Sequence, residues 1–146
     1  NRNINMNKSV KSRVAVYGTL KKGKSNHDAL STAKFIGGCY VTGKYRMFDL
    51  GAYPCVTKGG KDKSRVYAEV YEVDSETLSV LDCIEGHPDY YTRTKVRTPW
   101  KGAWMYFLPA SYASEGFEEV DSGCWRPSDE ESKFFASDEV SYDAVG

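Results

Sequence analysis

Alternation of apolar and polar residues predicts short β-strands along much of the chain. The clearest is RVYAEVYEV, 65–73, where Val66, Ala68 and Val70 would lie on one face of a strand. Strand-like runs of apolar and aromatic residues recur at 13–17, 34–51, 90–98 and 103–108. The turn sequence PWKG separates the last two runs, which predicts a hairpin.

The spacing of apolar residues changes from alternation to helical steps in DSETLSVLDCIEG, 74–86, which is the clearest predicted helix. Asp74 or Ser75 would cap its start, and Gly86 followed by Pro88 would end it. Its apolar residues recur in steps of three and predict one buried face, made of Leu78, Leu81 and Ile84.

A second, shorter helix is predicted through HDALSTA, 27–33, with Ser25 or Asn26 as its N-cap. Glycines also interrupt one strand-like run, and in strands they indicate bulges, bends or close backbone approach. They are Gly37, Gly38 and Gly43.

About six strands and two short helices result from this pattern. The strands follow one another too closely for a βαβ sheet, so we expect a mixed α+β fold around a small, bent, partly closed β-barrel. Residues 13–127 would form this domain, with a flexible arm at 1–12 and an acidic tail at 128–146.

Composition limits the class of protein. The chain has 146 residues, which suits one domain, and a formal net charge of zero, which does not favour nucleic acid or an anionic membrane as a partner. No apolar run approaches the roughly 20 residues of a membrane span. The four cysteines form no CxxC pair and there are only two histidines, so zinc-binding spacing is absent. We expect free thiols and a cytoplasmic protein.

The charges are unevenly distributed between the two ends. Residues 1–24 carry seven Lys or Arg and no acid, whereas residues 128–146 carry six acids and only Lys133 as a base. Two solvated ends of opposite sign would explain this distribution. A contact between the two segments, or with a partner, is the alternative.

Glu85 is the first candidate for chemistry. It lies at the end of the 74–86 helix, near the boundary of the predicted buried face. The partial negative charge of the last helix carbonyls and partial burial would both raise the pKa of its carboxyl. A glutamate with a pKa near neutrality suits a general acid and base. The alternative is an ordinary surface glutamate.

The second candidate is the loop YGTLKKGKSNH, from Tyr17 to His27. Gly18 permits unusual backbone conformations, so successive N–H groups could converge on an anion. A plain solvated turn is the alternative, and the lysines of the loop are expected to be surface charges. The loop does not match a P-loop. His27 and His87 are expected to be surface or structural residues, although His87 is close enough in sequence to tune Glu85.

Several short segments occur together in one order: YGTLKKGKSNH, GAYPCV, VYAEVYEVD, LDCIEG, YYTR, AWMYF and SGCWRP. Over residues 13–127 this combination resembles the gamma-glutamylcyclotransferase superfamily. The branch that it resembles most is the AIG2-like group, which includes gamma-glutamylamine cyclotransferase.

The resemblance implies a bent β-barrel with one cavity. It assigns substrate binding to the loop residues Tyr17, Gly18, Thr19 and Leu20, and the acid/base role to Glu85. It also places two aromatic residues at the cavity, Tyr91 beside the glutamate and Tyr53 nearby.

The implied reaction is intramolecular. The α-amine of a small γ-glutamyl substrate attacks the γ-carbonyl and releases 5-oxoproline and an amine or amino acid, without a metal or organic cofactor. A non-catalytic module that binds a small anion in the same cavity is the alternative, and a purely structural interaction domain is a third. The oligomeric state is left open.

Overall fold

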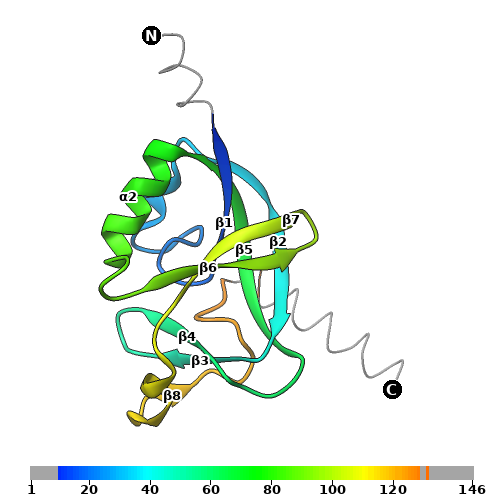
Figure 1. Cartoon of the computed structure of the whole chain (residues 1–146), viewed down its shortest axis with the longest axis vertical. Helices are drawn as coiled ribbons and strands as arrows, with labels where there is room; N and C mark the ends of the chain where they lie inside the picture. Colours follow the sequence, from blue (N-terminus) through cyan, green and yellow to red (C-terminus); the bar gives the residue numbers. More distant parts are fainter. Residues whose placement is uncertain (1–9, 129–130, 132–146) are drawn as a thin grey trace.

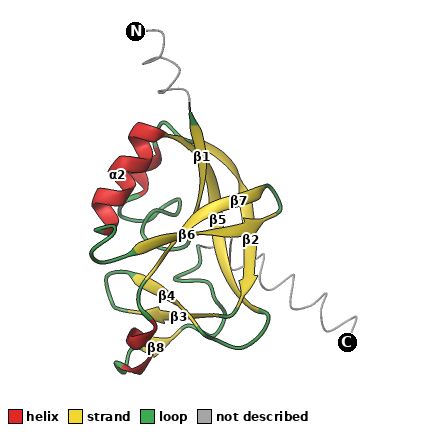
Figure 2. Cartoon of the chain, in the orientation of Figure 1, coloured by secondary structure: helices red, strands yellow, loops and turns green. Residues whose placement is uncertain are grey.

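The structure is a computed structural model, and it describes residues 10–128 and residue 131. This part of the chain folds into two β-sheets, one α-helix and two 3-10 helices (Figures 1 and 2). The strands are β1 (Lys11–Val16), β2 (Lys34–Gly43), β3 (Tyr45–Asp49), β4 (Pro54–Lys58), β5 (Ser64–Asp74), β6 (Thr92–Thr98), β7 (Lys101–Phe107) and β8 (Glu118–Glu119). The helices are η1 (His27–Leu30), α2 (Ser75–Glu85) and η2 (Ala110–Ser114).

The larger sheet has the strand order β2-β5-β1-β7-β6. Its pairs are antiparallel except for β1 and β7, which run parallel with Val14 opposite Trp104. The predicted β6–β7 hairpin is therefore confirmed, and it docks with β7 beside β1. The parallel pairing brings the ends of β1 and β7 to the same edge, where the loop after Val16 begins.

The smaller sheet has the order β4-β3-β8. It accounts for part of the predicted strand 34–51, which in fact divides into β2 in the larger sheet and β3 in the smaller. A register shift between Phe35 and Gly37 supplies one of the predicted bulges.

The α+β class is confirmed, whereas the barrel is not. Within residues 10–128 neither sheet closes on itself, because β2 and β6 remain the outer strands of the larger sheet. The strands of the smaller sheet pair only with one another and so do not complete a ring (Figure 1).

Helix α2 begins and ends as its sequence predicts. The Asp74 side chain accepts a hydrogen bond from the Thr77 N–H, and Gly86 ends the helix in the left-handed conformation with φ 69°. The predicted buried face is wrong at Ile84, which is 39% exposed, while Leu81 is fully buried. A step of four from Leu81 leads to Glu85, so the true helical period turns the glutamate inward.

The second predicted helix is shorter and tighter than expected. It forms one 3-10 turn, η1, preceded by Asn26. The Asn26 side chain does not cap it and instead donates to the Thr19 hydroxyl at 3.0 Å.

The core lies on both faces of the larger sheet. Alternate residues of β1 point to opposite sides: Ala15 packs with Met47 and Val56 of the smaller sheet, whereas Val14 packs in the cluster that includes Leu81 of α2. Both faces of β1 are therefore covered, and its end is held firmly where the loop begins. None of the helices in the described residues is long and apolar enough to cross a membrane.

Candidate active site

A small cavity opens at the end of β1, between the two sheets and the last turn of α2. Every site residue expected from the sequence lines it: Tyr17, Gly18, Thr19, Leu20, Tyr53, Glu85 and Tyr91. The structure thus brings together residues from four separate segments of the chain. The remaining lining residues are Ala15, Val16, Pro54 and Tyr106.

Glu85 has the electrostatic character of an acid/base group. Burial raises the pKa of its carboxyl from the ordinary value of 4.5 to about 7. Among the described residues no hydrogen bond or ion pair to this carboxyl is found, and burial is the cause of the shift. His87 lies close by in sequence, but its ring faces Tyr106, with the ring centroids 6.5 Å apart.

The loop after β1 forms a tight turn with unused donors. The Gly18 carbonyl accepts from the Lys21 N–H at 3.0 Å. Across residues 10–128, the N–H groups of Gly18, Thr19 and Leu20 donate no loop hydrogen bond and remain available to a ligand. Gly18 is required here by space, because a Cβ atom would lie 2.8 Å from Cγ and Cδ of Pro54.

Two of the cavity tyrosines join the sheets through their hydroxyls. Tyr17 donates to the Tyr106 carbonyl at 2.8 Å and accepts from the Val56 N–H at 3.1 Å. Tyr91 donates to the Pro54 carbonyl at 2.6 Å. Burial, followed by the nearby charge of Glu85, raises the pKa of Tyr17 well above its usual value, so it remains protonated.

Tyr53 differs from these two because its hydroxyl points to the outer side of the site. It lies 2.6 Å from the hydroxyl of Tyr90, which is 36% exposed. The ring of Tyr53 also packs edge to face against those of Tyr90 and Tyr91. An aromatic wall therefore leads from the cavity toward the surface.

Sequence analysis missed the network behind Glu85. Tyr106 lines the cavity and donates to Asp82 Oδ1 at 2.7 Å, and Arg93 donates to both oxygens of Asp82 at 2.9 and 3.1 Å. Asp82 lies one helical turn before Glu85, so the network fixes the end of α2. The segments YYTR and AWMYF contain two of these residues, and Asp82 precedes Glu85 by three positions, but no local pattern pairs them.

The expectation that the loop lysines are surface charges is wrong for Lys21. Its side chain is fully buried, and its ammonium lies 3.0 Å from Glu131 Oε1. A salt bridge thus joins the basic segment 1–24 to the acidic segment 128–146. This is the contact between the two segments that was the alternative to two solvated ends. Lys21 can be buried because the Trp125 carbonyl and the Glu131 carboxylate together replace the water around its ammonium.

The four cysteines, Cys39, Cys55, Cys83 and Cys124, are free thiols. Among the described residues no three His, Cys, Asp or Glu side chains group in a way that could hold a metal ion.

Comparison with known proteins identifies the family. The model of the family described as gamma-glutamyl cyclotransferase, AIG2-like, matches residues 14–127. A curated relative from Vibrio cholerae is 38% identical over 112 residues, which cover 77% of this chain and 93% of the relative. An Escherichia coli K12 relative, named a gamma-glutamylcyclotransferase family protein, is 31% identical over 77% of this chain and 95% of its own length.

The fold agrees with this match. The crystal structure of a mouse AIG2-like protein superposes with a TM-score of 0.65 at 29% identity and covers 77% of this chain and 88% of the mouse chain. The chain therefore belongs to the AIG2-like gamma-glutamyl cyclotransferase family.

Proposed function

We propose that the protein is a gamma-glutamyl cyclotransferase that converts a small γ-glutamyl amine or γ-glutamyl amino acid into 5-oxoproline and a free amine. The observation that carries this proposal is the pairing of two groups in one cavity. Glu85 has a pKa of about 7, and the unused N–H groups of Gly18, Thr19 and Leu20 line the same space.

The loop N–H groups would bind the α-carboxylate of the substrate. Three successive donors without internal partners suit an anion, and they carry no side-chain charge that could compete for it. With the carboxylate held there, the adjacent α-amine would lie in the same cavity as Glu85. The tethered γ-carbonyl then folds back toward the amine, and the enzyme mainly has to stabilise this folded conformation.

Glu85 would transfer protons between two nitrogen atoms. Its carboxylate takes a proton from the α-ammonium, and the freed amine attacks the γ-carbonyl to form the new C–N bond. The same carboxyl protonates the leaving nitrogen as the old C–N bond breaks. The ring nitrogen then gives its second proton to the same carboxylate, which passes it to the released amine. The amine leaves as an ammonium ion, and the glutamate returns to its ionised state.

The aromatic wall would contact the leaving group. Tyr53 lies where the cavity opens, and Tyr90 extends the wall outward. These rings offer apolar area with hydroxyls at the edge, which favours a leaving amine that carries a chain over free ammonia.

The test is release of 5-oxoproline from a panel of γ-glutamyl amines and γ-glutamyl amino acids. We expect Glu85→Gln to lower kcat by at least about 100-fold, because the amide cannot accept the proton. Glu76→Gln is the matched control, since Glu76 is an exposed acid in the first turn of the same helix. An active parent with an equally active Glu85→Gln variant would contradict the assignment.

A further inference from the structure

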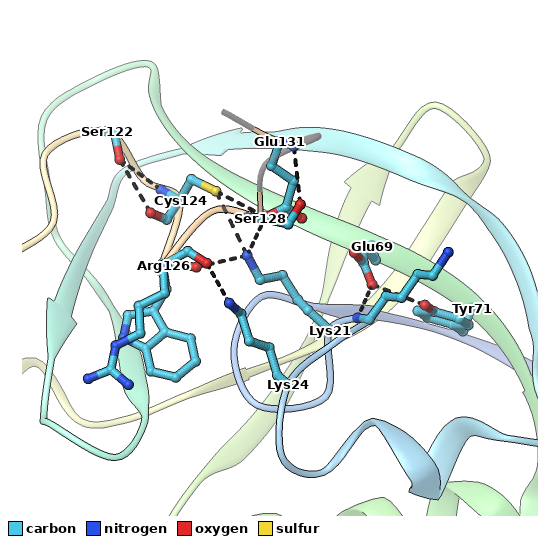
Figure 3. Close-up of polar contacts among 11 residues, drawn as sticks. Lys21, Lys24, Glu69, Tyr71, Ser122, Cys124, Arg126, Ser128 and Glu131 are labelled. Atoms are coloured by element: carbon cyan, nitrogen blue, oxygen red, sulfur yellow. Dashed lines mark hydrogen bonds and ion pairs between the residues drawn. The ribbon is translucent and has the colours of Figure 1, made fainter. Parts of the chain in front are cut away.

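The loop that lines the cavity is fastened to the C-terminal part of the chain through residues that do not line the cavity themselves. The fastening consists of Lys21 and Lys24 on the loop and of Trp125, Arg126 and Glu131 on the other side (Figure 3). None of these residues lines the cavity.

Lys21 is the centre of this contact. Its ammonium donates to the Trp125 carbonyl at 2.8 Å and to Glu131 Oε1 at 3.0 Å, and it lies 3.8 Å from the Cys124 sulfur. The side chain is 0% exposed and Glu131 is 8% exposed. A lysine buried to this degree is stable only when its charge is paired, so the contact depends on Glu131.

Glu131 is itself held in place. Ser128 N–H donates to Glu131 Oε1 at 3.0 Å, and Glu131 N–H donates to the Ser128 hydroxyl at 3.1 Å. Burial raises the pKa of the neighbouring Cys124 to about 11, so this thiol stays neutral and does not compete with the carboxylate for the ammonium.

The loop makes two further hydrogen bonds close to Lys21, one from its main chain and one from a side chain. Lys22 N–H donates to Glu69 Oε1 at 2.8 Å, and Lys24 Nζ donates to the Arg126 carbonyl at 2.6 Å. Figure 3 shows these contacts around one short stretch of the loop. Because the Lys21 N–H also closes the turn onto the Gly18 carbonyl, Lys21 links the remote contact directly to the turn.

We infer that Lys21 and Glu131 are positioning residues that hold the N–H groups of Gly18, Thr19 and Leu20 in the geometry for binding the substrate carboxylate. The identity of the substrate in this inference rests on the proposed function, whereas the contacts that hold the loop do not. Without Glu131 the buried ammonium must move toward water, and the loop has to move with it.

The expected kinetic signature separates positioning from catalysis. The carboxylate is bound equally in the ground state and the transition state, so a misplaced loop raises KM and leaves kcat nearly unchanged. We expect Glu131→Gln to raise KM at least about tenfold and to change kcat by less than about threefold. Glu119→Gln is the control, because it weakens an exposed ion pair with Arg46 away from the cavity.

A double variant distinguishes positioning from simple stabilisation. Lys21→Met with Glu131→Leu replaces the ion pair by apolar side chains of similar size, which often preserves stability. We expect its thermal midpoint to lie near that of the parent while its KM stays raised. A parent-like KM in this folded variant would show that the pair only fills the interior, and would overturn the inference.

Hydrogen exchange makes the test independent of activity. The N–H groups of Lys21, Lys22 and Asn26 are hydrogen-bonded in the fastened loop. We expect their exchange to be at least about tenfold faster in Glu131→Gln, with the sheet amides unchanged. If the parent turns over no substrate, the proposed function fails and exchange still decides the inference; unchanged exchange at these three amides would refute it.

Discussion

Glu85 is a carboxyl group whose burial affects both the stability of the fold and the proposed chemistry. It occupies a position on α2 where the helical period would place an apolar side chain, one turn after the fully buried Leu81. Its ionised form is therefore poorly solvated, and the same desolvation that raises its pKa to about 7 reduces the stability of the folded protein once the proton is lost.

This reasoning predicts how stability depends on pH. The pKa is higher in the folded state than the unfolded value of 4.5, so the folded protein binds the extra proton and loses stability as the pH rises from about 4.5 to about 7. Glu85→Gln should be more stable than the parent by up to about 3 kcal/mol at pH 8. The gain should disappear below about pH 4. Urea unfolding at both pH values measures it, and an equal gain at both would contradict the shift.

The same shift predicts the pH profile of the parent. If ionised Glu85 is the base, kcat/KM should rise tenfold per pH unit below about pH 7 and level off above it. The measurement is 5-oxoproline release between pH 5 and 9 at low substrate concentration. A profile that is flat across pH 7 would exclude Glu85 as the base.

Gly18 is the second residue where a single atom matters. Gly18→Ala would bring a Cβ within 2.8 Å of the Pro54 ring and push the loop away from β4. We expect kcat/KM to fall at least about tenfold, mainly through KM. Gly102→Ala is the matched control, since a Cβ there would meet its nearest neighbour at an ordinary 3.6 Å. Equal activity of the two variants would show that the loop does not need this contact.

At the scale of elements, the end of α2 is fixed by a network that crosses from helix to sheet. Asp82 on α2 is bound by Arg93 on β6 and by Tyr106 on β7. Burial acts to raise the pKa of Asp82, but the hydrogen bonds from Arg93 and Tyr106 outweigh it and hold the pKa below its ordinary value of 3.8. The ionised form of this carboxylate is thus part of the folded structure.

Asp82→Asn should weaken the attachment of α2. The folded pKa of Asp82 is depressed, so its contribution to stability is present above pH 4 and is lost as the pH falls through the folded pKa. We expect a loss of about 2 kcal/mol at pH 7 and a smaller loss at pH 3. Thermal unfolding at the two pH values tests this, and its trend is opposite to that of Glu85→Gln.

These elements also show what the sequence could and could not predict. Periodicity and caps placed α2 and the hairpin correctly, because those signals are local. The loop residues and Glu85 were predicted as site residues from short stretches of sequence, and the structure places them around one cavity, while their roles stay predictions. The role of Tyr106 depends on how β7 pairs with β1 and where α2 docks, and the burial of Lys21 depends on Glu131, 110 positions away. Local patterns do not contain such long-range contacts.

At the scale of the whole molecule, the cavity lies where the two sheets meet, and no strand of one sheet pairs with a strand of the other among the described residues. Their junction is made at β4, where Val56 accepts from the Leu108 N–H and donates to the Tyr17 hydroxyl, and Pro54 accepts from Tyr91. The hydroxyls of two tyrosines that line the cavity, Tyr17 and Tyr91, are therefore engaged in joining the sheets, and proton transfer is proposed for Glu85 instead.

Tyr17→Phe tests whether the Tyr17 hydroxyl serves to join the sheets rather than to act in the reaction. The substitution removes the hydroxyl that serves both the Tyr106 carbonyl and the Val56 N–H, so two buried groups lose a partner. We expect a loss of about 2 kcal/mol in stability and a kcat within about threefold of the parent at 15 °C. Tyr53→Phe is the matched control, because within the described residues its hydroxyl meets Tyr90 at the exposed side, and its stability should be nearly unchanged. A large fall in kcat for Tyr17→Phe with intact stability would contradict this expectation. The hydroxyl would then take part in the reaction, and its contacts between the sheets would be secondary.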